Sequence, residues 1–149
     1  MARYTIEEYV RWEDIDAAGI INYQAYLRFF GLAEAELLRS AGLNYRFLFE
    51  ALGIWLPRVR VECDFYFPVK LDELLAVEAY FSRIGRTSVH LNFEVRRKSD
   101  PSIVVARGLY VLVCVIAAWT ANRRFHAIFV ALNLVYQTSF IFRLYDVLG

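Results

Sequence analysis

The sequence predicts an α+β fold in which one long helix packs against an antiparallel β-sheet. Between Tyr23 and Ala41, apolar residues recur every three or four positions, which is the spacing of one helical face. After Pro57 they recur at every second position, which is the spacing of a strand with one buried face. One strand before the helix and four after it give the order expected for a helix on one face of a sheet. The 149 residues suit a single domain.

The first elements are predicted from local signals. β-Forming residues mixed with charges predict a strand over residues 4–12, and a loop follows over residues 13–19. The helix over residues 23–41 has Gly42 at the position of a C-cap glycine. Its apolar face consists of Tyr26, Phe29, Phe30, Ala33, Leu37, Leu38 and Ala41.

A shorter helix over residues 45–52 and four strands complete the predicted fold. The strands are expected over residues 59–67, 75–81, 89–96 and 103–115, with turns at residues 83–86 and 99–102. The first of them has a half-buried apolar face that consists of Val59, Val61, Cys63, Phe65 and Phe67. The last strand is apolar on both faces, so we expect a second copy to cover it, in a homodimer or a homotetramer.

The charge balance and the cysteine content exclude several classes of protein. With 17 basic and 16 acidic residues, the formal net charge is +1, which removes the electrostatic basis for nucleic-acid binding. Cys63 and Cys114 make no disulfide framework, and no cluster of Cys and His has the spacing of a zinc site. We therefore expect a cytoplasmic protein without a metal. Residues 1–8 contain acids and no apolar run, so we expect no signal peptide.

The hydrophobic content of 58% is high for a soluble protein and is concentrated near the end of the chain. The charged residues beyond residue 107 are Arg123, Arg124, Arg143 and Asp146. We therefore divide the chain into a domain over residues 1–115 and an atypical hydrophobic segment over residues 116–149. Because Arg123 and Arg124 interrupt its apolar run, we expect an interface segment or a poorly packed tail rather than a membrane span. An altered reading frame near residue 116 is a further interpretation of the same change in composition.

The acidic loop before the long helix is the candidate for chemistry. Glu13, Asp14 and Asp16 fall within four residues, and Gly19 lets the backbone turn into the helix. A helix N-terminus offers unpaired N–H groups and a partial positive charge, which can polarise a carbonyl and hold a developing oxyanion. A nearby carboxylate can then attack that carbonyl or activate a water. Acids before a helix are also good caps, so the residues alone leave capping and catalysis open.

Two stretches of the sequence carry a more specific pattern. The first runs from Trp12 to Phe30, WEDIDAAGIINYQAYLRFF, and has an aspartate followed three residues later by a glycine. The second lies between Pro68 and Ser88 and contains LDELLAV and IGRTS. Together they resemble the hotdog-fold acyl-CoA thioesterases of the 4-hydroxybenzoyl-CoA thioesterase type. The resemblance covers roughly residues 5–115 and implies the hotdog fold, a long helix packed on a curved antiparallel sheet.

The resemblance also implies a role for each matching position. Asp16 would be the catalytic carboxylate, as nucleophile or as general base toward water, and the backbone N–H of Tyr23 would stabilise the oxyanion. Gly19 would allow the close turn. The substrate would be bound by Asn22, Tyr26, Arg86, Thr87 and Ser88, with Arg86 at the phosphates of CoA. The alternative for Arg86 is a solvated turn residue. In this fold the acyl channel lies between subunits, so the resemblance implies that a dimer forms the active enzyme.

The activity implied by the resemblance is hydrolysis of an acyl-CoA thioester to a carboxylic acid and free CoA, without a metal or an organic cofactor. Another class of the family uses a glutamate on the helix, but Glu34 and Glu36 lie too far along this helix to share a centre with Asp16. We interpret these two residues as surface or interface acids. The alternatives are a non-catalytic acyl-CoA or acyl-carrier binding protein, a hotdog dehydratase or hydratase, and a membrane-associated protein anchored by the tail. A dehydratase needs a histidine at the mouth of the helix, and neither His90 nor His126 is placed there.

Overall fold

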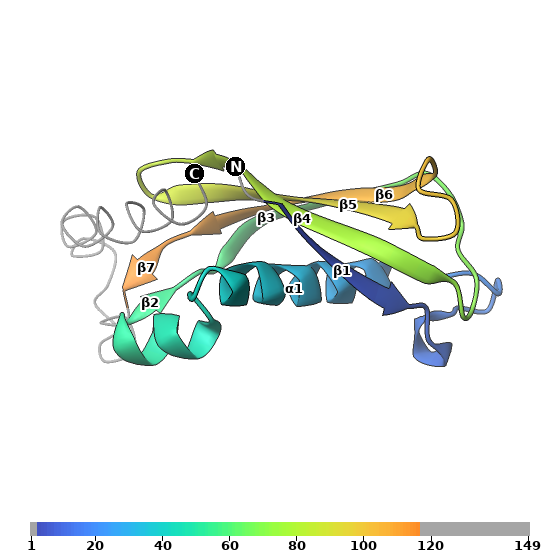
Figure 1. Cartoon of the computed structure of the whole chain (residues 1–149). Coiled ribbons are helices and arrows are strands. Elements are labelled where there is room, and N and C mark those ends of the chain that lie inside the picture. The colour runs from blue at the N-terminus through green and yellow to red at the C-terminus, as the bar shows by residue number, and fades with distance from the viewer. Residues whose placement is uncertain (1–2, 117–149) are drawn as a thin grey trace.

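The computed structural model describes residues 3–116, which form an antiparallel sheet wrapped around one long helix (Figure 1). The five strands of the sheet lie in the order β1 (Arg3–Tyr9), β4 (Leu74–Ile84), β5 (Ser88–Arg97), β6 (Val104–Val113) and β3 (Arg58–Phe65). The helix α1 (Tyr23–Ser40) packs along one face of this sheet. The predicted arrangement of a helix on an antiparallel sheet is therefore confirmed. Except for Ile116, the predicted hydrophobic segment over residues 116–149 lies outside the described residues.

The sequence patterns did not predict four short elements as the structure has them. The short strand β2 (Ile54–Trp55) pairs with β7 (Val115–Ile116) in a separate two-stranded sheet. The predicted helix near residue 50 contains a turn of π-helix, η2 (Phe47–Ala51). The first strand ends at Tyr9 rather than at residue 12, because Trp12–Asp14 form a 3-10 turn, η1. Within residues 3–116, no helix has the length and hydropathy needed to cross a membrane.

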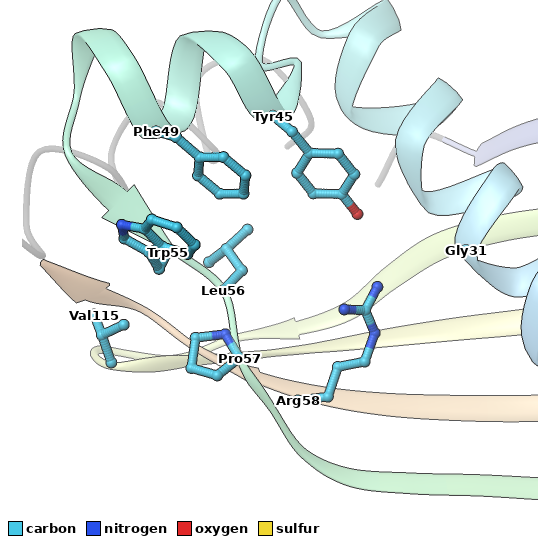
Figure 2. A pocket seen from close by; sticks show the side chains of 8 residues that line it. All are labelled: Gly31, Tyr45, Phe49, Trp55, Leu56, Pro57, Arg58 and Val115. Atoms are coloured by element: carbon cyan, nitrogen blue, oxygen red, sulfur yellow. The ribbon is translucent and has the colours of Figure 1, made fainter. Parts of the chain in front are cut away.

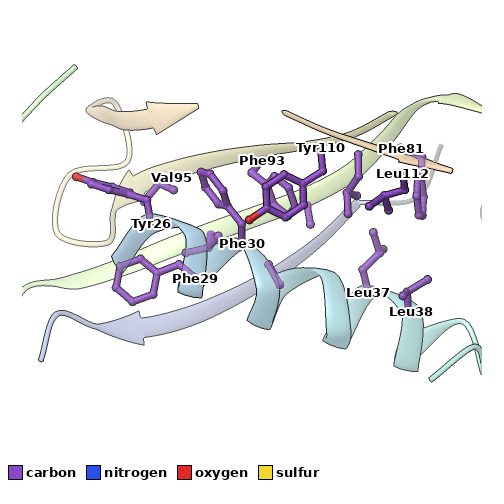
Figure 3. Packing of buried hydrophobic residues seen from close by; sticks show 14 of the residues in the cluster. Tyr26, Phe29, Phe30, Leu37, Leu38, Phe81, Phe93, Val95, Tyr110 and Leu112 are labelled. Carbon is purple, nitrogen blue, oxygen red and sulfur yellow. The ribbon is translucent and has the colours of Figure 1, made fainter. Parts of the chain in front are cut away.

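The core lies between α1 and the concave face of the sheet, and a cluster of aromatic rings forms its centre (Figure 3). Phe30 on α1 stacks against Phe93 on β5, with ring centroids 4.5 Å apart, and meets the edge of Tyr110 on β6. Gly108 on β6 lies directly beneath this ring, because an added Cβ atom would come within 2.3 Å of Phe30 Cε2. The absence of a side chain at residue 108 therefore lets the helix approach the sheet this closely.

Strand β3 lacks the buried apolar face that its alternating pattern predicts. Val59, Val61 and Phe65 are 62%, 47% and 52% exposed, so this prediction is wrong for the single chain. The reason is the position of the strand, since among residues 3–116 β3 is the edge strand of the sheet and pairs only with β6. An alternating sequence predicts that one face is covered but does not say whether the covering comes from the same chain.

Glu34 also differs from expectation, because it is fully buried rather than a surface or interface acid. It follows Phe30 by four residues and precedes Leu37 by three, so it lies on the apolar face of α1. The guanidinium of Arg58, on the neighbouring strand β3, forms an ion pair with its carboxylate. A buried charge requires such a partner, and the pairing of these two residues could not be seen in the sequence.

Candidate active site

The loop between η1 and α1 folds into a tight turn that begins at Asp16. Ile15 and Ile21 form an antiparallel β-bridge, and the Asp16 N–H donates to the carbonyl of Ile20 at 3.0 Å. The N–H of Gly19 donates to the carbonyl of Asp16 at 3.0 Å. Gly19 has a φ of +74°, a conformation that favours glycine. Asp16 therefore lies on the segment that enters the turn, and the opposite segment, which contains Ile21, continues into the helix.

The side chain of Asp16 is exposed and its orientation is fixed by one hydrogen bond. Its Oδ1 atom accepts from the backbone N–H of Ala18 at 2.8 Å. The other oxygen, Oδ2, makes no hydrogen bond to any residue in the range 3–116. The carboxylate is thus oriented by the loop while one of its oxygens is open to an approaching molecule, as a nucleophile or a base requires.

The N-terminus of α1 is capped by Asn22. The Oδ1 atom of Asn22 accepts from Ala25 N–H at 3.1 Å, and its Nδ2 atom donates to the carbonyl of Asp14 at 2.9 Å. The side chain expected to contact substrate is therefore used for capping. Tyr23 is the first helical residue, and its backbone N–H has no acceptor within the helix. This N–H lies at the positive end of the helix dipole, which favours a developing oxyanion.

A buried ion pair that the sequence patterns did not indicate supports this loop. Asp14 is only 2% exposed, and its carboxylate accepts from Arg28 Nη2 at 2.5 Å and from Arg28 Nε at 3.3 Å. It also accepts from the backbone N–H of Arg11 at 2.9 Å. The backbone carbonyl of Asp14 accepts from Asn22 N–H at 2.7 Å. Asp14 therefore links the start of the loop to the first turns of α1, and its position beside Asp16 was the only signal for it in the sequence.

Arg28→Gln is expected to lower the free energy of unfolding by about 1–3 kcal/mol, because the substitution leaves a buried carboxylate without its charged partner. Urea denaturation measures this change. The matched control is Arg46→Gln, which removes an exposed ion pair with Glu50 and should leave stability nearly unchanged. Equal stability of Arg28→Gln and the wild type would show that the pair does not support the loop.

Of the remaining substrate-binding candidates, Tyr26 is buried in the first turn of α1, and the other three lie apart from the Asp16 loop. Tyr26 is 2% exposed and packs against Phe65 with ring centroids 5.2 Å apart, and this burial raises the pKa of its hydroxyl. Arg86, Thr87 and Ser88 are at the turn between β4 and β5. Strand β4 begins beside the loop and ends at this turn, so roughly 30 Å of strand separates Arg86 from Asp16. Within one chain, the structure does not bring the two predicted parts of the site together (Figure 1).

The described part of the chain offers no metal site, since it contains no group of three His, Cys, Asp or Glu side chains that could bind an ion. Cys63 and Cys114 are not joined in a disulfide. Burial raises the pKa of Cys63 to about 12 and that of Cys114 to about 11. The thiols are therefore protonated at neutral pH and poor nucleophiles, which leaves Asp16 as the candidate for covalent or acid–base chemistry.

Comparison with known proteins places this loop in a family. The sequence profile of the thioesterase-like superfamily matches residues 10–132, which include the Asp16 loop, α1 and all of β3 to β6. The chain belongs to this superfamily. The expectation of a thioester hydrolase drawn from residues 12–30 and 68–88 is thereby confirmed at the level of the family.

Relatives with assigned names agree with this placement. A 1,4-dihydroxy-2-naphthoyl-CoA hydrolase from Nostoc punctiforme is 26% identical over 115 residues, which are 77% of this chain and 76% of the relative. The acyl-CoA thioesterase YbgC from Haemophilus influenzae is 26% identical over 106 residues, which are 71% of this chain and 76% of the relative.

Solved structures of thioesterases share the hotdog fold of this chain. Slr0204, a 1,4-dihydroxy-2-naphthoyl-CoA thioesterase from Synechocystis, superposes with a TM-score of 0.73 at 19% identity, covering 89% of this chain and 96% of that one. A mutant of 4-hydroxybenzoyl-CoA thioesterase in complex with 4-hydroxybenzoyl-CoA superposes with a TM-score of 0.72 at 22% identity, covering 87% and 97%. The predicted hotdog fold is therefore confirmed.

Proposed function

We propose that this protein hydrolyses acyl-CoA thioesters to a carboxylic acid and free CoA, with Asp16 as its catalytic carboxylate. The observation that carries the proposal is the exposed carboxylate of Asp16, held by the Ala18 N–H in the loop that leads into the N-terminus of α1. A carboxylate and an unpaired helix N–H are the two groups that thioester cleavage needs. The names of the relatives, which act on CoA thioesters, support the choice of substrate.

The reaction has two forms that this arrangement supports. In both, the thioester carbonyl oxygen accepts a hydrogen bond from the Tyr23 N–H, which stabilises the negative charge that develops there. As nucleophile, Asp16 attacks the carbonyl carbon and displaces the CoA thiolate, and water then cleaves the resulting anhydride and regenerates the carboxylate. As general base, Asp16 accepts a proton from the water that attacks the carbonyl and transfers it to the departing thiolate. Gly19 shapes the turn that holds the carboxylate.

We further propose that two copies associate through the exposed edge of β3 and that the CoA site forms between them. Val59, Val61 and Phe65 supply an apolar surface on an edge that no strand of residues 3–116 covers, and such an edge is the usual location for strand-to-strand association. A two-fold axis would pair the two β3 strands antiparallel, so the Phe65 end of one would lie beside the Arg58 end of the other. The turn that carries Arg86 is at the Arg58 end, because β6 connects the two through Leu112 and Val113. Such pairing moves Arg86 of one copy toward Asp16 of the other, for contact with the phosphates of CoA.

Val61→Lys is expected to convert the assembly to monomers, since Val61 lies near the middle of β3 and the two introduced charges would face each other across the two-fold axis. Light scattering coupled to size-exclusion chromatography measures the mass. Leu71→Lys, an exposed apolar position away from β3, is the control and should keep the wild-type mass. A monomeric wild type, or an unchanged mass for Val61→Lys, would refute association through this edge.

A non-catalytic acyl-CoA or acyl-carrier binding protein is the alternative on the same scaffold, and turnover distinguishes the two. The test is thiol release from acyl-CoA by the wild type, together with equilibrium binding of the same acyl-CoA. Thiol release in excess of the protein concentration supports the enzyme. Binding without release supports the binding protein and overturns the proposal. A cytoplasmic location, expected from two cysteines that make no disulfide framework, remains a prediction.

A further inference from the structure

Asn22 lies at the point where the Asp16 loop becomes helix α1. Asp16 precedes it on the segment that enters the turn, and Tyr23, the proposed oxyanion donor, follows it directly. The carboxylate and the N–H group that would act on one carbonyl therefore belong to two different segments, with Asn22 at their junction. Catalysis requires that two such groups are held in one productive geometry.

The side chain of Asn22 makes two hydrogen bonds that point to these two segments. Its Oδ1 atom accepts from Ala25 N–H at 3.1 Å, inside the first turn of α1. Its Nδ2 atom donates to the carbonyl of Asp14 at 2.9 Å, two residues before Asp16. One amide group therefore connects the first turn of the helix with the segment that carries the Asp16 carboxylate.

The carbonyl of Asp14 accepts twice from Asn22, because the main-chain N–H of Asn22 also donates to it at 2.7 Å. A single main-chain hydrogen bond would fix a distance but would allow the first turn of α1 to rotate about it. The side chain, which holds Asp14 and Ala25 at once, restricts that rotation. The ion pair between Arg28 and Asp14 holds the same residue from the second turn of the helix.

Capping alone does not require an asparagine at this position. Asparagine, aspartate and serine are about equally good N-caps, and each supplies an oxygen that accepts from an N–H of the first turn. Asparagine carries an NH₂ group beside that oxygen, which aspartate lacks. In this structure the NH₂ group of Asn22 is used, because it binds the carbonyl of Asp14.

We propose that Asn22 is a positioning residue for thioester cleavage, whose side chain sets the placement of the Tyr23 N–H relative to the Asp16 carboxylate. This role rests on the proposed function of Asp16. Asn22 touches no reacting atom in it and acts through Asp14 and the first turn of α1. Its loss matters because a misplacement of about 1 Å can lower a rate by about 100-fold.

Asn22→Ser tests this role, because serine keeps an oxygen for Ala25 N–H but has no NH₂ group for Asp14. We expect kcat for acyl-CoA hydrolysis to fall by about 10-fold, since the main-chain bond at 2.7 Å remains and limits the displacement. KM should change by less than about threefold, because Asn22 makes no contact with the substrate in this role.

Asn22→Asp is a second variant that removes the same donor. It keeps the cap and the shape of the side chain but places an oxygen against the carbonyl of Asp14, which is itself an acceptor. Its kcat should fall at least as much as that of Asn22→Ser. Circular dichroism establishes that each variant is folded, and if Asn22→Ser is not, Asn22→Asp replaces it in every comparison.

Asn44→Ser is the matched control. Asn44 Oδ1 accepts from Phe47 N–H at 3.0 Å, so this asparagine caps the helical segment before β2 as Asn22 caps α1. It lies beyond the opposite end of α1, directly before Tyr45 in the segment that Figure 2 shows. The same exchange of residues at this distance from Asp16 should leave kcat within about twofold of the wild type.

A comparison in two backgrounds separates positioning from general damage to the fold. Asp16→Asn has no carboxylate left to place, so adding Asn22→Ser to it should change the residual rate by less than about twofold. Damage to the fold would instead lower the residual rate by the same factor as in the wild type.

Three results would overturn the role of Asn22 while the proposed function stands. These are a kcat of Asn22→Ser within about twofold of the wild type, an equal loss in Asn44→Ser, or equal losses in the two backgrounds. Asn22 would then be a cap only. A wild type that releases no thiol, or an Asp16→Asn variant with full activity, would refute the proposed function itself and the role of Asn22 with it.

Discussion

Asp16→Asn is expected to lower kcat for thioester hydrolysis by about 10²–10⁴-fold, the range for loss of a general base. The asparagine side chain can neither attack the carbonyl nor accept a proton from water. Its amide oxygen can still accept the hydrogen bond that Ala18 N–H gives to Asp16 at 2.8 Å, so the loop keeps its shape. KM should change much less than kcat, because the lost interaction is made with the reacting atoms. Steady-state thiol release measures both constants.

The control for this variant is Glu13→Gln. Glu13 is exposed, lies three residues before Asp16 and makes no hydrogen bond to another side chain in the described range. Glu13→Gln removes one negative charge from the same loop, as Asp16→Asn does. The activity of Glu13→Gln should nevertheless stay within about twofold of the wild type, as for surface substitutions away from a site. Full activity in Asp16→Asn, or equal losses in the two variants, would contradict the role given to Asp16.

Gly108→Ala is expected to destabilise the fold by about 3 kcal/mol, at the upper end of the usual cost of overpacking a core. The new methyl group would lie 2.3 Å from Phe30 Cε2. Phe30 cannot move away easily, because its ring is stacked on Phe93 and meets Tyr110 at its edge. The helix must therefore shift from the sheet or the cluster must repack. Urea denaturation with a fixed m-value measures the loss.

Gly31→Ala introduces the same methyl group as Gly108→Ala but is expected to raise the stability of the fold rather than lower it. Gly31 is in the interior of α1, and an added Cβ atom meets nothing within 4 Å. Alanine there should stabilise the protein by about 0.5–1 kcal/mol through helix propensity and reduced freedom of the unfolded chain. A Gly108→Ala variant as stable as the wild type would show that the contact of α1 with β6 is looser than the structure has it.

The sequence predicted well those features that depend on the spacing of residues close together in the chain. The apolar face of residues 23–41 became α1, which ends at Ser40, and the turn signals at residues 83–86 and 99–102 separate β4, β5 and β6. Gly19 was expected to turn the chain into the helix, and it does so with a positive φ. These patterns depend only on neighbours in the sequence, so one chain is enough to read them.

The features that sequence analysis missed depend on contacts between distant residues. Arg28 follows Asp14 by fourteen residues, and Arg58 follows Glu34 by twenty-four, so neither pair has a helical or strand spacing that would reveal it. The alternation of β3 predicted a covered face, but the order of strands places it at an edge. Arg86 was expected at the site of Asp16 because both residues match the sequence pattern of the same family. That pattern does not say which end of the sheet each residue occupies.

The most direct measurement of the central claim is thiol release from a panel of acyl-CoAs with aromatic, short and long acyl groups, using wild type and Asp16→Asn that are equally folded. The account predicts many turnovers by the wild type on at least one acyl class and a collapse of turnover in Asp16→Asn, and the best substrate would identify the acyl group. Binding of acyl-CoA by both proteins with no thiol released by either would contradict it.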